Sequence, residues 1–155
     1  MRRNLSCLLP FGAAAAAALC LGSAATAQPA NDLCANAQGV AIPSSTAGTL
    51  VSATAEPGPP PTCVTTYAGT PAVWYTLVGN GNTLTVETCS TAVSFDTKLH
   101  VYCSTNANPC TSPVSFACVT GNDDGPTGCG TVSPIRLSRV TFCSTAGQTY
   151  YVMVS

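Results

Sequence analysis

The residues best suited to chemistry lie in one short acidic segment, Asn122-Asp123-Asp124. Carboxylate and amide oxygens are the hard ligands that Ca²⁺ prefers, and the ion takes about 6–8 of them. The segment supplies only part of such a shell, so we expect Asp96 or Asp32 to complete it. The spacing is not that of an EF-hand, because no glutamate follows at the required offset. The alternative is that these side chains cap a turn by binding nearby backbone amides.

Hydrolytic chemistry has weaker candidates. A Ser-His-Asp triad needs a general base, and the chain has one histidine, His100. His100 falls on the polar side of an alternating segment, residues 95–102, where we expect it to be solvated. Asp123 and Asp124 are adjacent, so we expect their side chains to diverge rather than to form the facing pair of a glycosidase. Neither a phosphate-binding glycine loop nor a dinucleotide fingerprint occurs. The sequence predicts a protein that is not an enzyme and that needs no cofactor apart from calcium.

Tyrosines are the second kind of binding candidate. An aromatic ring with one wet face can stack on a sugar, and we single out Tyr102 and Tyr75, with Tyr67 and Tyr151 as further members of the set. The alternative is ordinary strand packing, since tyrosine is enriched in strands. The ligand predicted by this pattern is an extracellular polymer or glycan.

The first 27 residues have the pattern of a secretory signal peptide. A basic start precedes an alanine-rich apolar run, and Ala25-Thr26-Ala27 offers the small residues of a cleavage site. We expect cleavage before Gln28 and a single domain over residues 28–155. The mature chain would be secreted or extracellular, with the cell surface or periplasm as alternatives. No second apolar run follows, so no membrane span is expected after signal removal.

The charge of residues 28–155 excludes two classes of partner. Three basic residues remain against six acidic ones, a formal net charge of −3. Without a basic patch, binding to nucleic acid or to an anionic membrane surface is not expected.

Eight cysteines follow the signal segment, and an even count in an exported chain predicts four disulfides. Zinc is disfavoured because no CxxC pair occurs. Eight cysteines allow 105 pairings. Short loops favour the first two predicted bridges, and the other two follow by elimination: Cys103–Cys110, Cys118–Cys129, Cys34–Cys63 and Cys89–Cys143.

The fold class follows from short β-type segments separated by Gly, Pro, Asn and Ser. Residues 72–77 carry the lone Trp74, expected as a core anchor, and a Gly/Asn turn leads into residues 83–89, which predicts a β-hairpin. Alternation places Leu84 with Val86, and Val140 with Phe142, on inward faces. Further strands are expected at residues 48–55, 95–102, 114–119, 135–142 and 149–154. Together they predict an all-β sandwich or barrel.

Several motifs occur in a familiar order: Asn31-Asp32-x-Cys34, Val73-Trp74-Tyr75, Thr88-Cys89-Ser90, Phe95-Asp96-Thr97, Asn122-Asp123-Asp124 and Ala146-Gly147-x-Thr149-Tyr150. Over residues 31–155 the chain resembles the bacterial pre-peptidase C-terminal domain family and its cysteine-containing secreted relatives. The resemblance implies an antiparallel, jelly-roll-like β-sandwich. It also implies a non-catalytic accessory module that serves binding, stabilisation or processing of a larger exported protein. Some relatives in collagenases bind calcium and their polymeric substrate.

The chain departs from this family pattern at both ends. No peptidase precedes the module, and the chain stops at Ser155, where the family continues into a closing strand. We therefore expect a fragment of a longer protein, with further domains of that protein as partners, or a sandwich that lacks its closing C-terminal strand. The alternative function is a free-standing extracellular polymer- or glycan-binding protein, with or without calcium dependence.

Overall fold

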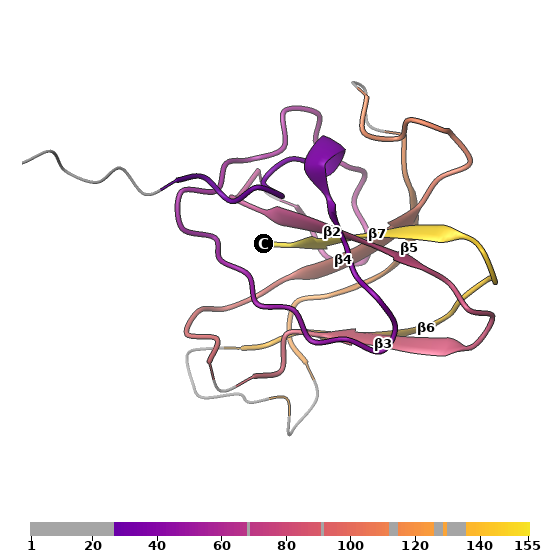
Figure 1. Cartoon of the computed structure of the whole chain (residues 1–155). Helices are drawn as coiled ribbons and strands as arrows, with labels where there is room; N and C mark the ends of the chain where they lie inside the picture. The colour runs from indigo at the N-terminus through magenta and orange to yellow at the C-terminus, as the bar shows by residue number, and fades with distance from the viewer. Residues whose placement is uncertain (1–26, 68, 91, 112–114, 126–128, 130–135) are drawn as a thin grey trace, which may run out of the picture.

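The structure is a computed structural model that describes residues 27–67, 69–90, 92–111, 115–125, 129 and 136–155 (Figure 1). The predicted signal segment therefore lies outside the described residues up to position 26. One 3-10 turn and seven strands make up the regular structure of the described part: η1 (Cys34–Asn36), β1 (Gln38–Gly39), β2 (Val73–Val78), β3 (Thr83–Glu87), β4 (Leu99–Cys103), β5 (Ala117–Asn122), β6 (Arg139–Cys143) and β7 (Thr149–Val154).

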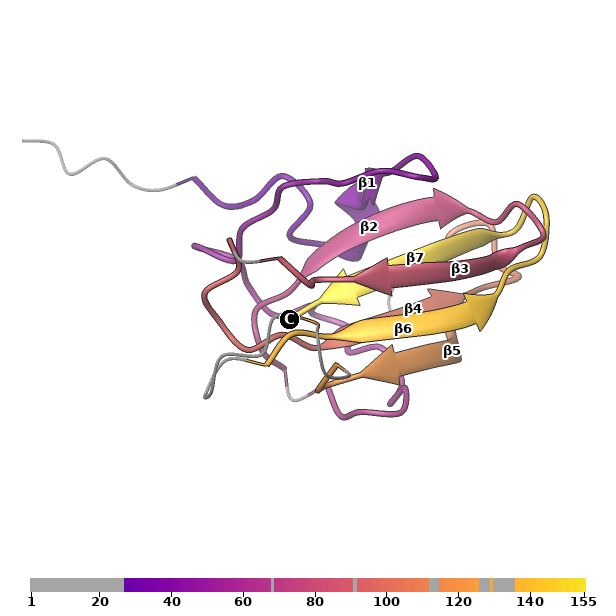
Figure 2. The same cartoon turned by 90° about the horizontal axis from the view of Figure 1, so that it is seen from below.

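The strands form two sheets. The larger has the order β1-β2-β7-β4-β5, and the smaller pairs β3 with β6. Figure 2 shows β3 and β6 lying across one face of the larger sheet. A shared apolar core joins the sheets, with Leu84, Val140 and Phe142 from the small sheet against Leu77, Leu99, Val101, Tyr150 and Val152 from the large one. The all-β prediction and these inward faces are confirmed. The larger sheet is mixed rather than antiparallel throughout, because β1 runs parallel to β2.

The predicted hairpin between residues 72–77 and 83–89 is wrong. β2 pairs with β7, and β3 pairs with β6. The Gly/Asn turn carries the chain from one sheet to the other, beside the turn that joins β6 to β7. Gly79 donates its N–H to the Gln148 carbonyl at 2.8 Å and accepts from Gly147 at 2.9 Å. A Cβ on Gly79 would lie 2.3 Å from the Thr145 carbonyl oxygen, so this close approach requires glycine.

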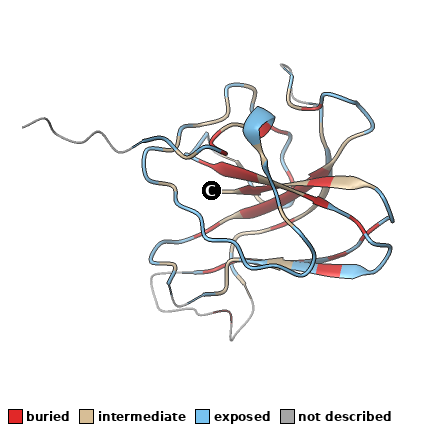
Figure 3. Ribbon diagram, viewed as in Figure 1, coloured by how far each residue is buried: buried red, intermediate tan, exposed pale blue. Residues whose placement is uncertain are grey.

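The second face of the larger sheet is covered by irregular chain. Trp74, Tyr102 and Met153 are fully buried there, packed against Cys34 and Cys63. Figure 3 shows burial running through the central strands although loops form the cover. The prediction that His100 and Tyr102 face solvent is wrong, since both are 0% exposed. Residues 48–55, predicted as a strand, are irregular chain.

Three disulfides join cysteines of the described part: Cys34–Cys110, Cys63–Cys118 and Cys89–Cys129. All four predicted pairs, Cys103–Cys110, Cys118–Cys129, Cys34–Cys63 and Cys89–Cys143, differ from these. The first two predicted pairs assumed that a bridge closes a short loop, and the other two followed by elimination, whereas the observed bridges span 40 to 76 residues and join segments that are neighbours only in the fold. Cys103 and Cys143 remain as thiols.

We expect peptide mapping of the unreduced protein to recover these three linkages. Native alkylation should label Cys143 quickly, because its side chain is exposed, and Cys103 more slowly, because its side chain is partly buried in the core. Labelling at Cys34 or Cys63 instead, or a linkage between Cys103 and Cys110, would contradict the three bridges described above.

Candidate functional site

Three carboxylates converge where the chain enters β4 and leaves β5. Ligand oxygens of Asp96, Asp123 and Asp124 all lie within 4.8 Å of one another. Two of these carboxylates already form ion pairs with basic side chains. Lys98 Nζ lies 2.6 Å from the Asp123 carboxylate, and Arg136 Nη1 lies 2.7 Å from that of Asp124. We call Asp96, Asp123 and Asp124 the acidic cluster.

A buried hydroxyl network holds the acidic cluster in place. Thr97 and Ser138 are both 0% exposed. The Thr88 and Thr97 hydroxyls lie 2.7 Å apart, and the Ser138 N–H donates to the Thr97 hydroxyl at 3.1 Å. The Ser138 hydroxyl is within hydrogen-bond distance of the Thr97 and Asp123 carbonyls and donates its single proton to one of them at a time. This network connects the residue after Asp96 to the backbone of Asp123.

Two other residues of the calcium prediction lie outside the acidic cluster. The Asn122 side-chain oxygen accepts the Arg139 N–H at 3.2 Å, which ties β5 to β6. Asp32 is buried and accepts from the Thr54 N–H at 2.5 Å and from the Thr54 hydroxyl at 2.6 Å. Asp32 therefore caps the irregular cover by side-chain to backbone bonding.

Its neighbour Asn31 serves the same cover. The Asn31 side chain donates to the Trp74 carbonyl at 2.9 Å, and the Asn31 carbonyl accepts the Trp74 N–H at 2.8 Å. The side chains of Asn31 and Asp32 thus hold the irregular chain over the second face by hydrogen bonds.

The acidic cluster fits a calcium ion in part. It supplies three of the oxygen ligands that Ca²⁺ takes, and solvent has access because Asp96 and Asp124 are exposed. Lys98 would have to give way. The Lys98 and Asp123 side chains are 37% and 40% exposed. Such half-exposed ion pairs contribute at most about 1 kcal/mol to stability, so displacing Lys98 from Asp123 costs little free energy.

His100 is a fully buried side chain. Its ring stacks on Tyr102 at a centroid distance of 6.1 Å, and neither ring nitrogen makes a hydrogen bond with the described residues. Burial lowers the pKa of His100. Lys98 adds to this shift, while the Cys63 carbonyl and the Asp123 carboxylate oppose it. The imidazole is therefore a neutral core side chain at pH 7.

The tyrosines singled out for sugar stacking differ in their exposure. Tyr102 is fully buried and donates to the Pro61 carbonyl at 3.1 Å, and burial raises its pKa. Tyr75 is half-buried, and its hydroxyl lies 2.2 Å from the position that a Cβ on Gly48 would take. Tyr67 is occupied by hydrogen bonds to Glu56 and Thr70. Tyr102 therefore cannot stack on a ligand, whereas Tyr151 lines an open pocket.

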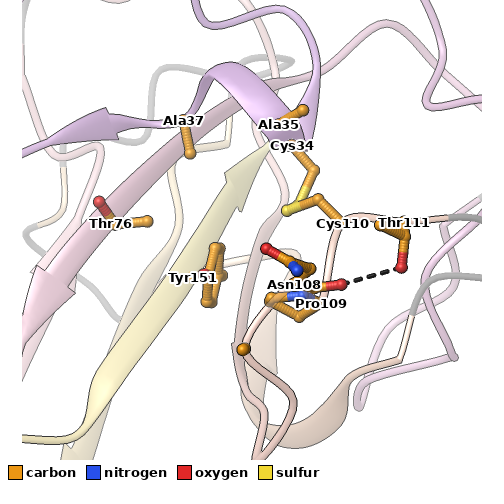
Figure 4. A pocket seen from close by; sticks show the side chains of 10 residues that line it. Cys34, Ala35, Ala37, Thr76, Asn108, Pro109, Cys110, Thr111 and Tyr151 are labelled. Carbon is orange, nitrogen blue, oxygen red and sulfur yellow. Dashed lines mark hydrogen bonds between the residues drawn. A yellow bond between two sulfur atoms is a disulfide. The ribbon is translucent and has the colours of Figure 1, made fainter.

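The Tyr151 pocket has a volume of about 330 Å³ (Figure 4). Its floor is Thr76 on β2 and Tyr151 on β7, which are paired in register. One wall is the η1 turn, and the other is the loop after β4 that contains Asn108. The Cys34–Cys110 disulfide joins the two walls. Tyr151 was among the tyrosines predicted to stack on a sugar, but no local sequence pattern places residue 34 beside residue 110.

No protein-family model, curated protein or solved structure matches this chain. Across the described residues, none of the helical structure is long and apolar enough to cross a membrane.

The lowered pKa of His100 predicts a loss of stability in mild acid. Below its ordinary pKa of about 6.5, the unfolded chain binds a proton that the folded chain excludes. The free energy of unfolding should therefore fall as the pH drops from 7 to 5.5, by at most about 1.4 kcal/mol per pH unit for this one proton.

The measurement is urea denaturation of wild type and His100→Leu across this range. We expect a flatter pH profile in the variant. The two proteins differ only at position 100, so a difference between their pH profiles reports on His100. An unchanged slope would show that His100 is not the group responsible.

Proposed function

We propose that this chain is a non-catalytic module of an exported protein and that its work is binding. Its architecture would be a variant of the jelly-roll-like sandwich of the pre-peptidase C-terminal family. The observation that carries the proposal is the Tyr151 pocket, whose walls are fixed by the Cys34–Cys110 bridge. Pre-organised walls lower the ordering cost of binding. Disulfides of this kind persist in oxidising compartments, which supports an extracellular location.

The structural roles of His100 and Ser138, two residue types common in active sites, also support this proposal. His100 is packed on Tyr102, and Ser138 holds backbone carbonyls within the hydroxyl network. These groups stabilise the fold and leave binding as the activity that the described surface offers. The partner would be an extracellular polymer or another domain of the same protein. A free-standing polymer-binding protein is the alternative.

Retention on insoluble polymers tests this function. We expect oxidised protein to be retained on at least one of cellulose, chitin and collagen, and to bind less when the Cys34–Cys110 bridge is removed by Cys34→Ala with Cys110→Ala. Removal of the bridge frees one pocket wall, whereas Val78→Ala changes an exposed residue outside the pocket and serves as the control. Failure of all three polymers to retain wild type would contradict the proposal.

Calcium binding at the acidic cluster is a second proposed property, and the convergence of its three carboxylates favours it. Lys98 and Ca²⁺ would compete for Asp123. Substitutions at Asp96 and Lys98 should therefore change calcium affinity in opposite directions.

A thermal melt with excess calcium or with EDTA measures this effect. Calcium should raise the midpoint of wild type, because a ligand at a hundredfold excess over Kd adds about 2.7 kcal/mol. Asp96→Asn should shrink the difference, and Lys98→Met should enlarge it. Equal midpoints with calcium and EDTA in both wild type and Lys98→Met would leave the carboxylates as an ion-pair network only.

A further inference from the structure

The Tyr151 pocket has the chemistry of a site for an uncharged, hydroxyl-rich ring. None of the described residues that line it carries a charge. Its polar groups are the hydroxyls of Thr76 and Thr111, the Asn108 amide and the Tyr151 phenol. Such groups bond equally well as donors and acceptors to neutral polar ligands, whereas an ionic ligand would find no counter-charge.

Tyr151 supplies the apolar surface of the pocket. It is partly exposed, and it lies between Thr76 and the Asn108 wall (Figure 4). Behind it, the ring of Phe116 lies at a centroid distance of 5.0 Å and an interplanar angle of 52°. Phe116 in turn stacks on the buried Trp74 at 5.7 Å. Tyr151 is therefore braced by core aromatics, and its remaining exposed surface is held in one orientation.

Rigid flanks surround this ring. Tyr151 is paired with Thr76 across β7 and β2. The loop wall is shaped internally, because the Thr111 hydroxyl donates to the Asn108 carbonyl at 2.9 Å. The volume of about 330 Å³ is at the small end of the range for ligand sites, roughly 300–1,000 Å³. A site of this size accepts one ring of a longer molecule.

We propose that the Tyr151 pocket binds one ring of a neutral glycan, with the C–H face of the sugar on Tyr151 and its hydroxyls on Asn108 and Thr76. This inference rests on the proposed binding function and specifies its ligand class. Aromatic rings combine apolar contact with a wet edge, which suits a sugar ring. The net charge of −3 over residues 28–155 further disfavours acidic polysaccharides, which the chain would repel.

Isothermal titration of the oxidised protein with cellohexaose and chitohexaose tests the proposal, beside oligogalacturonate of equal length and gelatin. We expect one of the neutral hexamers to bind and the acidic oligomer not to bind. Tyr151→Ala should weaken binding at least tenfold, while Tyr151→Phe, which keeps the ring, should stay within about threefold of wild type. Asn108→Ala should weaken binding severalfold.

Asn106→Ala is the matched control, since Asn106 is an exposed amide in the same loop that does not line the pocket. If Tyr151→Ala fails to fold, Asn108→Ala decides the matter, because Asn108 is exposed and, among the described residues, its hydrogen bonds are made by its backbone carbonyl.

The outcomes separate this inference from the proposed function. A neutral hexamer that binds the folded Tyr151→Ala and Asn108→Ala variants as tightly as wild type would overturn the pocket and leave the binding module intact. If only oligogalacturonate or only gelatin binds, the proposal of a neutral glycan ligand is wrong, while the proposal of a binding module still holds. Absence of binding to every probe, together with no retention on insoluble polymers, would overturn both.

Discussion

The structure depends on the burial of both faces of the five-stranded sheet. Its strand β4 has four consecutive residues, Leu99 to Tyr102, that are each 0% exposed, so neither face can be left to solvent. The β3–β6 pair covers one face with alternating apolar residues. Irregular chain covers the other face, and this chain lacks the backbone hydrogen bonds by which a paired strand is held in a sheet. Two disulfides and the side-chain hydrogen bonds of Asn31 and Asp32 hold it in place instead.

The same anchors shape the surface where binding is proposed. Cys34–Cys110 draws the η1 turn and the loop after β4 toward each other across β2 and β7, and the Tyr151 pocket is the space left between them. Buried hydroxyls fix the acidic cluster in a similar way, because Thr97 and Ser138 join the chain before β4 to the chain after β5. In both places, groups that look chemically versatile in the sequence stabilise the loops that carry the candidate site.

Sequence periodicity predicted the inner core but not the outer cover. The inward positions Leu84, Val140 and Phe142 were predictable because a period of two reports directly on a half-buried strand. The same alternation wrongly placed His100 and Tyr102 in solvent, because it cannot show that a loop distant in sequence covers the polar face of the strand. Asp96 and Asp123 come together because β4 and β5 are antiparallel neighbours. Strand order also decides the disulfides, and local spacing contains no information about it.

The Cys34–Cys110 bridge holds the cover over the second face, and the lone Trp74 reports on that face directly. The decisive measurement is acrylamide quenching of Trp74 fluorescence in wild type and in Cys34→Ala with Cys110→Ala. We predict a shielded tryptophan in wild type, which is 0% exposed, and severalfold stronger quenching in the variant while the far-ultraviolet β-sheet signal is retained. Equal shielding of Trp74 in both folded proteins would contradict the account.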